Sequence, residues 1–195
     1  MSTRLVYYYL KLQAMALLVF NRREAALLVF DLILERVPDD RYALASQAQV
    51  LVQLGRRDEA LALQERLVTL YPDNLPSWFN LGYLLEEDGR HERAEAAFRR
   101  VIELDPKMDR AWYGLALVLI KMRRFDEAVV VLKKNTELQP MSPFGWYQLA
   151  RVHVDRHEPE EAVKIIRHLK GFEPKVAAQL ERETGLHASP ATQPS

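Results

Sequence analysis

The sequence repeats a pair of landmarks, a proline and an alanine, every 34 residues. The prolines are Pro38, Pro72, Pro106, Pro140 and Pro174, and the alanines are Ala26, Ala60, Ala94, Ala128 and Ala162. A fixed period of about 20 to 50 residues is typical of a solenoid, in which one supersecondary unit stacks on the next. The period therefore predicts a repeat array whose function lies on a protein-binding surface rather than in a catalytic pocket.

The repeats follow one another without an insertion, over residues 7–40, 41–74, 75–108, 109–142 and 143–176. Position eight of each repeat is small: Ala14, Ala48, Gly82, Ala116 and Ala150. The third repeat reads Trp78-x2-Leu81-Gly82-x2-Leu85, then Ala94-x3-Phe98, then Pro106. This pattern closely resembles the tetratricopeptide repeat, a helix–turn–helix unit of 34 residues. The resemblance implies an all-α fold, namely a right-handed α-solenoid of five helical hairpins.

Each landmark has a physical role within such a hairpin. A large residue at position four is expected to pack against the small residues at positions eight and twenty, where the two helices cross closely. The proline ends the second helix, because its ring and its missing N–H prevent continuation. Gly55 and Gly89 stand at the bend inside their repeats, where a left-handed residue closes the first helix. Gln64 and Asn135 occupy packing positions, and each is expected to have a local hydrogen-bond partner.

The two ends of the chain need separate interpretation. The apolar run from Leu5 to Phe20 is interrupted by Lys11 and Gln13, so it predicts the first helix of repeat one rather than a signal peptide or a membrane span. A short capping helix is expected at about residues 174–184, and a disordered tail at 187–195. Residues 1–186 are therefore expected to form a single repeat domain.

Composition narrows the class of function further. The 27 basic residues balance the 27 acidic ones, which argues against nucleic acid as a partner. Cysteine is absent, which excludes a thiolate site and fits a cytoplasmic protein. No phosphate-binding loop or nucleophile motif is present, so we expect no enzyme activity, no cofactor and no catalytic residues. His153 and His157 lie four residues apart, but no third ligand accompanies them, so His153 is interpreted as a packing residue rather than a metal ligand.

In the tetratricopeptide-repeat family, the first helices line a concave groove that binds other proteins. The resemblance places thirteen candidate groove residues on this face: Tyr8, Lys11, Tyr42, Gln49, Phe79, Asn80, Tyr83, Arg110, Tyr113, Phe144, Tyr147, Gln148 and Arg151. Aromatic side chains offer a large contact area and are enriched at binding hot spots. The sequence therefore predicts an adaptor or chaperone that holds a peptide or helical segment of another protein, although some of these rings could instead fill space between helices.

The second helix of repeat one suggests an alternative. Leu28, Val29 and Leu32 fall where the family usually has polar residues. Terminal repeats ordinarily need a polar outer face for solubility. The alternative function is therefore a self-assembling scaffold that forms homo-oligomers through repeat one.

Basic residues recur at the bend of every repeat: Arg22-Arg23, Arg56-Arg57, Arg90-His91, Arg123-Arg124 and Arg156-His157. They could contact an acidic partner, but neighbouring carboxylates such as Asp58 and Glu127 favour local ion pairs instead.

Overall fold

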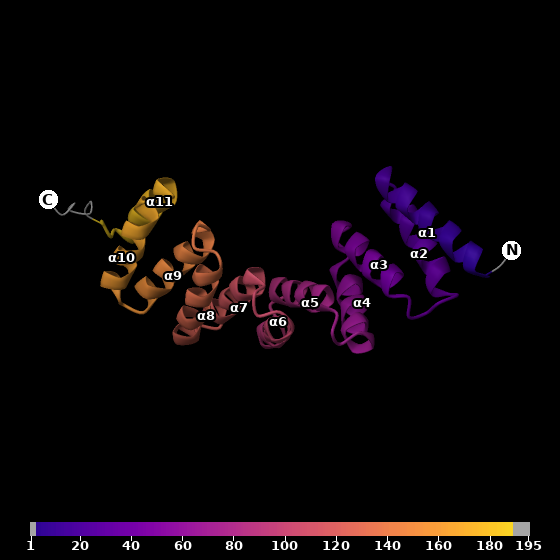
Figure 1. Cartoon of the computed structure of the whole chain (residues 1–195), viewed down its shortest axis with the longest axis horizontal. Helices are drawn as coiled ribbons and strands as arrows, with labels where there is room; N and C mark the ends of the chain where they lie inside the picture. Colours follow the sequence, from indigo (N-terminus) through magenta and orange to yellow (C-terminus); the bar gives the residue numbers. More distant parts are fainter. Residues whose placement is uncertain (1–2, 189–195) are drawn as a thin grey trace. The chain divides into compact units, whose positions relative to one another are not determined.

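The computed structural model describes residues 3–188, and over that range it consists of helices joined by short turns, without a β-strand (Figure 1). The helices are α1 (Thr3–Val19), α2 (Arg23–Leu34), α3 (Arg41–Gln53), α4 (Arg57–Leu70), α5 (Leu75–Glu87), α6 (His91–Leu104), α7 (Asp109–Lys121), α8 (Phe125–Leu138), α9 (Pro143–Asp155), α10 (Pro159–Lys170) and α11 (Pro174–Thr184). The odd-numbered helices α1 to α9 are the first, or A, helices of the five repeats, and the even-numbered helices are the second, or B, helices. Helix α11 begins in the last residues of repeat five, in the segment where the sequence predicts a capping helix.

The chain divides into two compact units, an N-terminal unit that ends at Leu85 and a C-terminal unit that begins at Glu86. In the N-terminal unit, α1 packs on α2, α2 on α3 and α3 on α4. In the C-terminal unit, consecutive helices from α6 to α11 pack in pairs, and α11 also contacts α9. The single domain expected over residues 1–186 remains a prediction.

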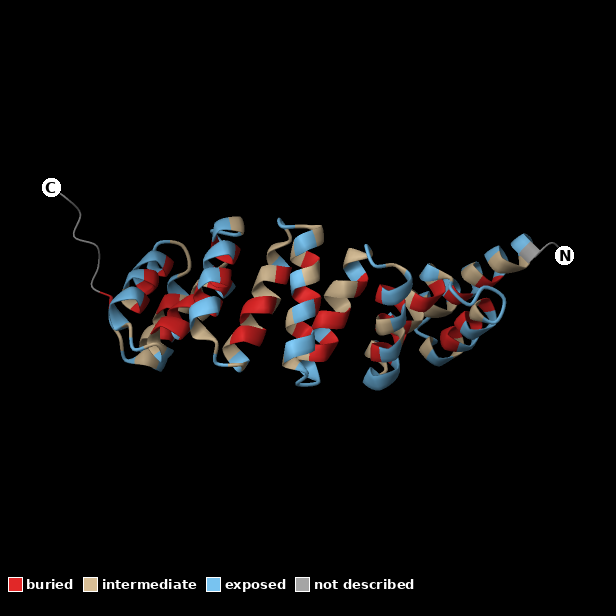
Figure 2. Cartoon of the chain, turned by 90° about the horizontal axis from the view of Figure 1, so that it is seen from below, coloured by how far each residue is buried: buried red, intermediate tan, exposed pale blue. Residues whose placement is uncertain are grey.

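The core is built from the small residues of the repeat. All five alanines at position twenty have no exposed surface, and neither do the alanines at position eight. Figure 2 shows the buried residues as bands along the packed sides of the helices, with exposed residues on the other sides. A larger side chain at these positions would hold the two helices of a hairpin apart, since protein interiors are close-packed. The sequence-based role of these alanines is confirmed.

The bend inside every repeat uses one residue in the left-handed conformation. Gly55 and Gly89 have φ of 76°, as predicted. At the same position the other three repeats have Asn21, Arg123 and His157, with φ between 57° and 61°. The bend geometry is therefore common to all five repeats, and three of them form it with a residue that is less favourable there than glycine.

Three of the landmark prolines end a B helix through the residue that precedes them. Tyr71, Asp105 and Gln139 come directly before a proline and leave the helical conformation, with φ between −131° and −143°. This agrees with the steric restriction that proline places on its predecessor. Pro38 and Pro174 differ, because α2 ends earlier, at Leu34, and α10 at Lys170, and Pro174 is the first residue of α11.

The C-terminal tail differs in part from its prediction. Residues 189–195 lie outside the described part of the chain, but Ala188 is described and buried. Its N–H donates to Glu181 at 2.9 Å, and its carbonyl accepts from Lys170 at 2.7 Å. The expectation of disorder is therefore wrong for Ala188, because two polar partners on α10 and α11 satisfy its backbone groups.

Candidate functional site: the faces of the A helices

The thirteen predicted groove residues all lie on A helices, and none of their side chains is buried. Seven belong to the N-terminal unit and six to the C-terminal unit. The most exposed aromatic side chains among them are Tyr8, Tyr83 and Phe144. Exposed aromatic rings leave apolar area in contact with water, which is a property of binding surfaces.

The first cluster of predicted residues joins α1 to α3. The Lys11 ammonium lies 3.9 Å from the centre of the Tyr42 ring and 5.4 Å from that of Tyr7. The Tyr7 hydroxyl donates to Asp40 at 2.7 Å, and the same carboxylate caps α3 by accepting from the N–H of Ala43. Burial and this hydrogen bond to Asp40 raise the pKa of Tyr7 to about 12. Tyr7 therefore stays a neutral donor, and Lys11 and Tyr42 hold each other in place.

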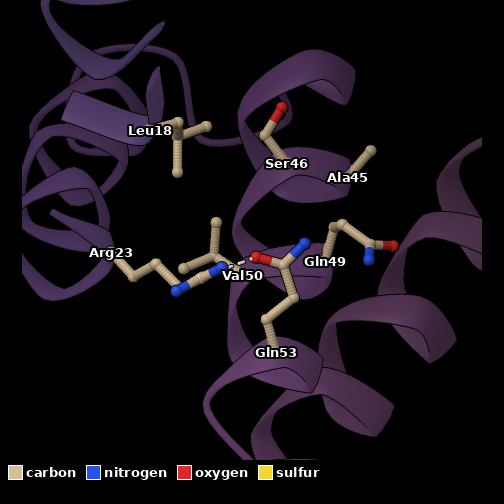
Figure 3. A pocket seen from close by; sticks show the side chains of 7 residues that line it. All are labelled: Leu18, Arg23, Ala45, Ser46, Gln49, Val50 and Gln53. Carbon is tan, nitrogen blue, oxygen red and sulfur yellow. Dashed lines mark hydrogen bonds between the residues drawn. The ribbon is translucent and has the colours of Figure 1, made fainter. Parts of the chain in front are cut away.

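A first pocket lies between repeats one and two, and we call it the Gln49 pocket (Figure 3). Its lining residues come from α1, α2 and α3: Leu18, Arg23, Ala45, Ser46, Gln49, Val50 and Gln53. The Arg23 side chain donates through Nε to Gln53 Oε1 at 2.8 Å, as Figure 3 shows. The Gln49 side chain is exposed at this pocket.

A second pocket, which we call the Asn80 pocket, lies between α3, α4 and α5. It brings together two predicted groove residues, Tyr42 and Asn80, with Gln64 of α4. The Gln64 side chain is 3% exposed, and its Oε1 atom has no hydrogen-bond partner within the described residues. A buried acceptor without a partner costs about 1–3 kcal/mol, so such an atom is rare in a native fold.

The prediction of a local partner is thus wrong for Gln64 and confirmed for Asn135. The side-chain amide of Asn135 donates to the carbonyl of Asp109 at 2.9 Å. Gln64 faces α3 and α5 across the Asn80 pocket, where no neighbouring donor reaches its oxygen. The sequence showed a polar residue at a packing position but could not show whether a partner was within reach.

In the C-terminal unit, two of the predicted groove residues are bound by the capping helix. The Tyr147 hydroxyl donates to Glu183 of α11 at 2.6 Å, and the guanidinium of Arg151 donates to the Tyr147 oxygen at 3.3 Å. The hydrogen bond from Tyr147, followed by that from Gln179, lowers the pKa of Glu183. Arg151 therefore has an acidic neighbour within its own chain. The other four predicted residues lie on α7 and α9. The side chains of Arg110 and Phe144 are exposed, and those of Tyr113 and Gln148 are partly buried.

Four of the basic residues at the bends form ion pairs, namely Arg56, Arg90, Arg124 and Arg156. Arg56 binds Glu59 through two contacts of 2.6 Å, and this hydrogen bonding lowers the pKa of Glu59. Arg124 likewise binds Glu127 at 2.6 Å and also Glu95. The electrostatic explanation based on neighbouring carboxylates is supported at these positions.

His153 has the partner expected of a packing histidine. Its side chain is buried, and its Nδ1 atom lies 2.7 Å from Glu158. Among residues 3–188, no group of three histidine or acidic side chains is arranged to hold a metal ion.

One of the three predicted self-association residues is misplaced. Leu28 and Leu32 are exposed on α2, but Val29 is buried. Val29 stands at the repeat position that Ala97, Val131 and Ile165 occupy in later repeats, and these are also buried. This side of a B helix packs inward in each of these repeats, so the apolar patch on α2 is smaller than predicted.

The tryptophans at position four also form a hydrogen bond, whereas the sequence predicted only a packing role for them. The indole N–H groups of Trp78, Trp112 and Trp146 donate to the carbonyls of Pro72, Pro106 and Pro140, at 2.8, 2.9 and 2.8 Å. Each bond ties an A helix to the turn before it. The constant spacing of six residues between proline and tryptophan is the signal that could have revealed it.

Comparison with known proteins agrees with this architecture. Two family profiles described as tetratricopeptide repeat match residues 40–107 and 85–143, which together span residues 40–143. The chain belongs to the tetratricopeptide-repeat family, and its fold is an all-α solenoid of such repeats. No curated protein sequence matches the chain.

Solved structures share the fold at low sequence identity. MamA from Desulfovibrio magneticus is 19% identical, with a TM-score of 0.78 over 91% of this chain and 96% of that one. YrrB, a tetratricopeptide-repeat protein with an unusual peptide-binding site, is 21% identical, with a TM-score of 0.78 over 87% of this chain and 88% of that one. A tetratricopeptide-repeat protein from Parabacteroides merdae is 18% identical, with a TM-score of 0.81 over 92% of this chain and 73% of that one. In the described part of the chain, no helix has the length and apolar character needed to cross a membrane.

Proposed function

We propose that the protein is a non-enzymatic adaptor or chaperone that binds an extended segment of another protein at the Asn80 pocket. The family assigns the chain a role in protein–protein interaction. The observation that carries the finer proposal is the buried, unpartnered oxygen of Gln64 in a pocket that Tyr42 and Asn80 also line. YrrB, which shares the fold, has a peptide-binding site, and this similarity supports the same class of ligand.

The chemistry of the pocket fits a peptide main chain. An extended segment presents alternating N–H donors and carbonyl acceptors, while Asn80 offers one amide donor group and one acceptor. Gln64 offers an acceptor that the folded chain leaves unused. The ring of Tyr42, fixed by Lys11, supplies an apolar wall for a side chain of the bound segment. Because this oxygen is buried, a bound N–H reaches it only when the Gln64 side chain turns toward the pocket, and that contact would relieve a cost that the free protein carries.

The test begins with peptides selected from a randomised displayed library against the full chain. Their affinities are then measured for the wild type, Asn80→Ala and Gln64→Leu. We expect Asn80→Ala to weaken binding by about tenfold with an unchanged melting temperature. Gln64→Leu removes the unused acceptor at similar volume, so it is expected to raise the melting temperature and still weaken binding.

Gln139→Ala serves as the matched control, because Gln139 is an exposed amide outside both pockets. Its affinity for the selected peptides is expected to equal that of the wild type. Unchanged affinity in both Asn80→Ala and Gln64→Leu would contradict the proposal.

A further inference from the structure

The outward side of α1 differs from the same side of every other A helix. Position three of the A helix is small and buried in repeats two to five, where it is Ala43, Ser77, Ala111 and Gly145. In repeat one it is Tyr9, which is 60% exposed.

The later repeats show why this position is small. A Cβ atom added to Gly145 would lie only 2.2 Å from the side-chain oxygen of Asn135 on the preceding B helix. A tyrosine does not fit beneath a B helix that approaches so closely. The outward side of α1 is therefore not shaped for a preceding repeat of the same kind.

The exposed residues on this side of α1 form a stripe, which we call the α1 seam. Its members are Leu5, Tyr9, Leu12, Ala16 and Val19, and all five are exposed. The intervals of four, three, four and three residues are those of a coiled-coil seam. Helix α1 has 17 residues, against 13 in each of the other A helices, which gives the seam more than two heptads.

The seam is free of charge and apolar over most of its length. The only charged residues of α1 are Arg4 and Lys11, and Lys11 faces the rings of Tyr7 and Tyr42. Leu5, Leu12 and Val19 are 60%, 67% and 81% exposed. With Tyr9, they leave an apolar area on the order of several hundred Å², a size that usually marks an interaction surface.

We propose that α1 pairs in antiparallel fashion with α1 of a second copy of this chain, about a two-fold axis at Leu12. In this register Leu5 lies opposite Val19 of the other copy and Leu12 lies opposite Leu12, and the seam residue nearest to Tyr9 is Ala16 of the other copy, one residue away from the level of Tyr9. The largest seam residue thus meets the smallest, which lets the two helices approach closely. A two-fold contact is self-complementary, so one surface serves both copies.

The charges of α1 favour the same arrangement. The last turn of α1 contains no basic residue, so no side chain of the helix offsets the partial negative charge of that end. An antiparallel pair places Arg4 of each copy near that end of the other. A parallel pair would instead set Tyr9 against Tyr9 and leave Arg4 away from both C-terminal ends.

Cysteine cross-linking tests the register directly, because the chain contains no cysteine of its own. Under mild oxidation, Leu12→Cys is expected to form a disulfide-linked dimer, since residue 12 faces its own copy across the axis. Leu5→Cys alone is expected to stay monomeric under denaturing conditions, whereas Leu5→Cys combined with Val19→Cys cross-links. Efficient cross-linking of Leu5→Cys alone, without that of Leu12→Cys, would overturn the antiparallel register.

Sedimentation of the full chain tests the association itself. The wild type is expected to dimerise with concentration, and Leu12→Glu to weaken the dimer by about 100-fold, because two like charges meet at the axis. An equimolar mixture of Leu12→Glu and Leu12→Lys is expected to restore the dimer. The control is Leu28→Glu, an exposed apolar position outside the seam, which is expected to dimerise like the wild type.

Two results would overturn the proposal. One is a wild type that stays monomeric at about 100 μM, a concentration at which even a weak specific dimer forms. The other is loss of the dimer in Leu28→Glu but not in Leu12→Glu, which would move the interface to α2. Circular dichroism of each variant shows whether the helices remain folded.

Discussion

Helices α1 and α11, the first and the last of the described chain, both expose one side to solvent, but with different chemistry. Helix α11 buries Ala177 and Leu180 against α9 and α10. Its outer side consists of polar residues, among them Lys175, Gln179 and Arg182. The outer side of α1 instead carries the apolar α1 seam.

The two helices show two different arrangements at the ends of a repeat array: the apolar surface of the terminal repeat is either covered by a further helix or left exposed. An edge of a solenoid has apolar positions that the next repeat would normally cover. At the C-terminal edge, an amphipathic helix of the same chain covers them. At the N-terminal edge no described segment does so, and the large, exposed Tyr9 replaces the small, buried residue of the other repeats. A covered edge should contribute to folding, and an uncovered one to association.

The largest expected effect is a difference in the free energy of unfolding between a substitution in α11 and one in α1. Leu180→Ala removes a fully buried side chain, so it is expected to lower the free energy of unfolding by about 2–5 kcal/mol. Leu12→Ala changes an exposed side chain, so its effect on the isolated chain should stay within about 0.5 kcal/mol. Chemical denaturation at low protein concentration measures both. Similar losses in the two variants would show that α1 and α11 are equally packed.

The next largest effect is expected at position three of the A helix, where Gly145 lies close to the side chain of Asn135. Gly145→Ala introduces a methyl group against Asn135, so it is expected to cost about 1–3 kcal/mol. Most of that cost should disappear when Asn135 is also changed to alanine, because the clashing oxygen is then absent. Tyr9→Ala is the counterpart in repeat one, and it should leave the stability of the isolated chain nearly unchanged. A double-mutant cycle without coupling would contradict the account of Gly145.

A smaller effect is expected at the bends. Arg123 adopts a left-handed conformation that glycine adopts more readily, so Arg123→Gly should stabilise the chain by about 0.5–1 kcal/mol. Asn21 holds the same position in repeat one, and asparagine tolerates this conformation, so Asn21→Gly should change little. Thermal melting of the two variants makes the comparison. An equal gain at both bends would show that residue type is not the cause.

The smallest effect concerns pH and the docking of α11. The folded-state pKa of Glu183 is lowered, so its contribution to stability is present above the ordinary carboxyl pKa and is lost as pH falls through the lowered value. The melting temperature of the wild type should therefore exceed that of Glu183→Gln at neutral pH, and the difference should vanish in acid. A difference that is the same at pH 7 and at about pH 3 would contradict this role.

Much of the fold could be predicted from the sequence, because the determinants are local and periodic. The buried alanines, the left-handed Gly55 and Gly89, and a helix beginning at Pro174 all follow from residue type and spacing. These features depend on contacts within one hairpin or its turn, which the 34-residue period repeats five times.

The site was less predictable, because it depends on distances between residues far apart in the sequence. The sequence placed Tyr42 and Asn80 on A helices but could not show that Gln64 would lie in the same pocket without a partner. It also marked Arg151 as a groove residue, although Glu183 of α11 lies beside it. Val29 was assigned to the outer face of α2 because the family usually has a polar residue at that position, and only the packing of α2 shows that it is buried.

Hydrogen exchange at two protein concentrations tests most directly whether α11 closes one edge and α1 joins two copies at the other. The account predicts that amide protection in α1 rises with protein concentration, since pairing shields that helix, while protection in α11 stays constant. Protection of α1 that does not change between dilute and concentrated protein would contradict it.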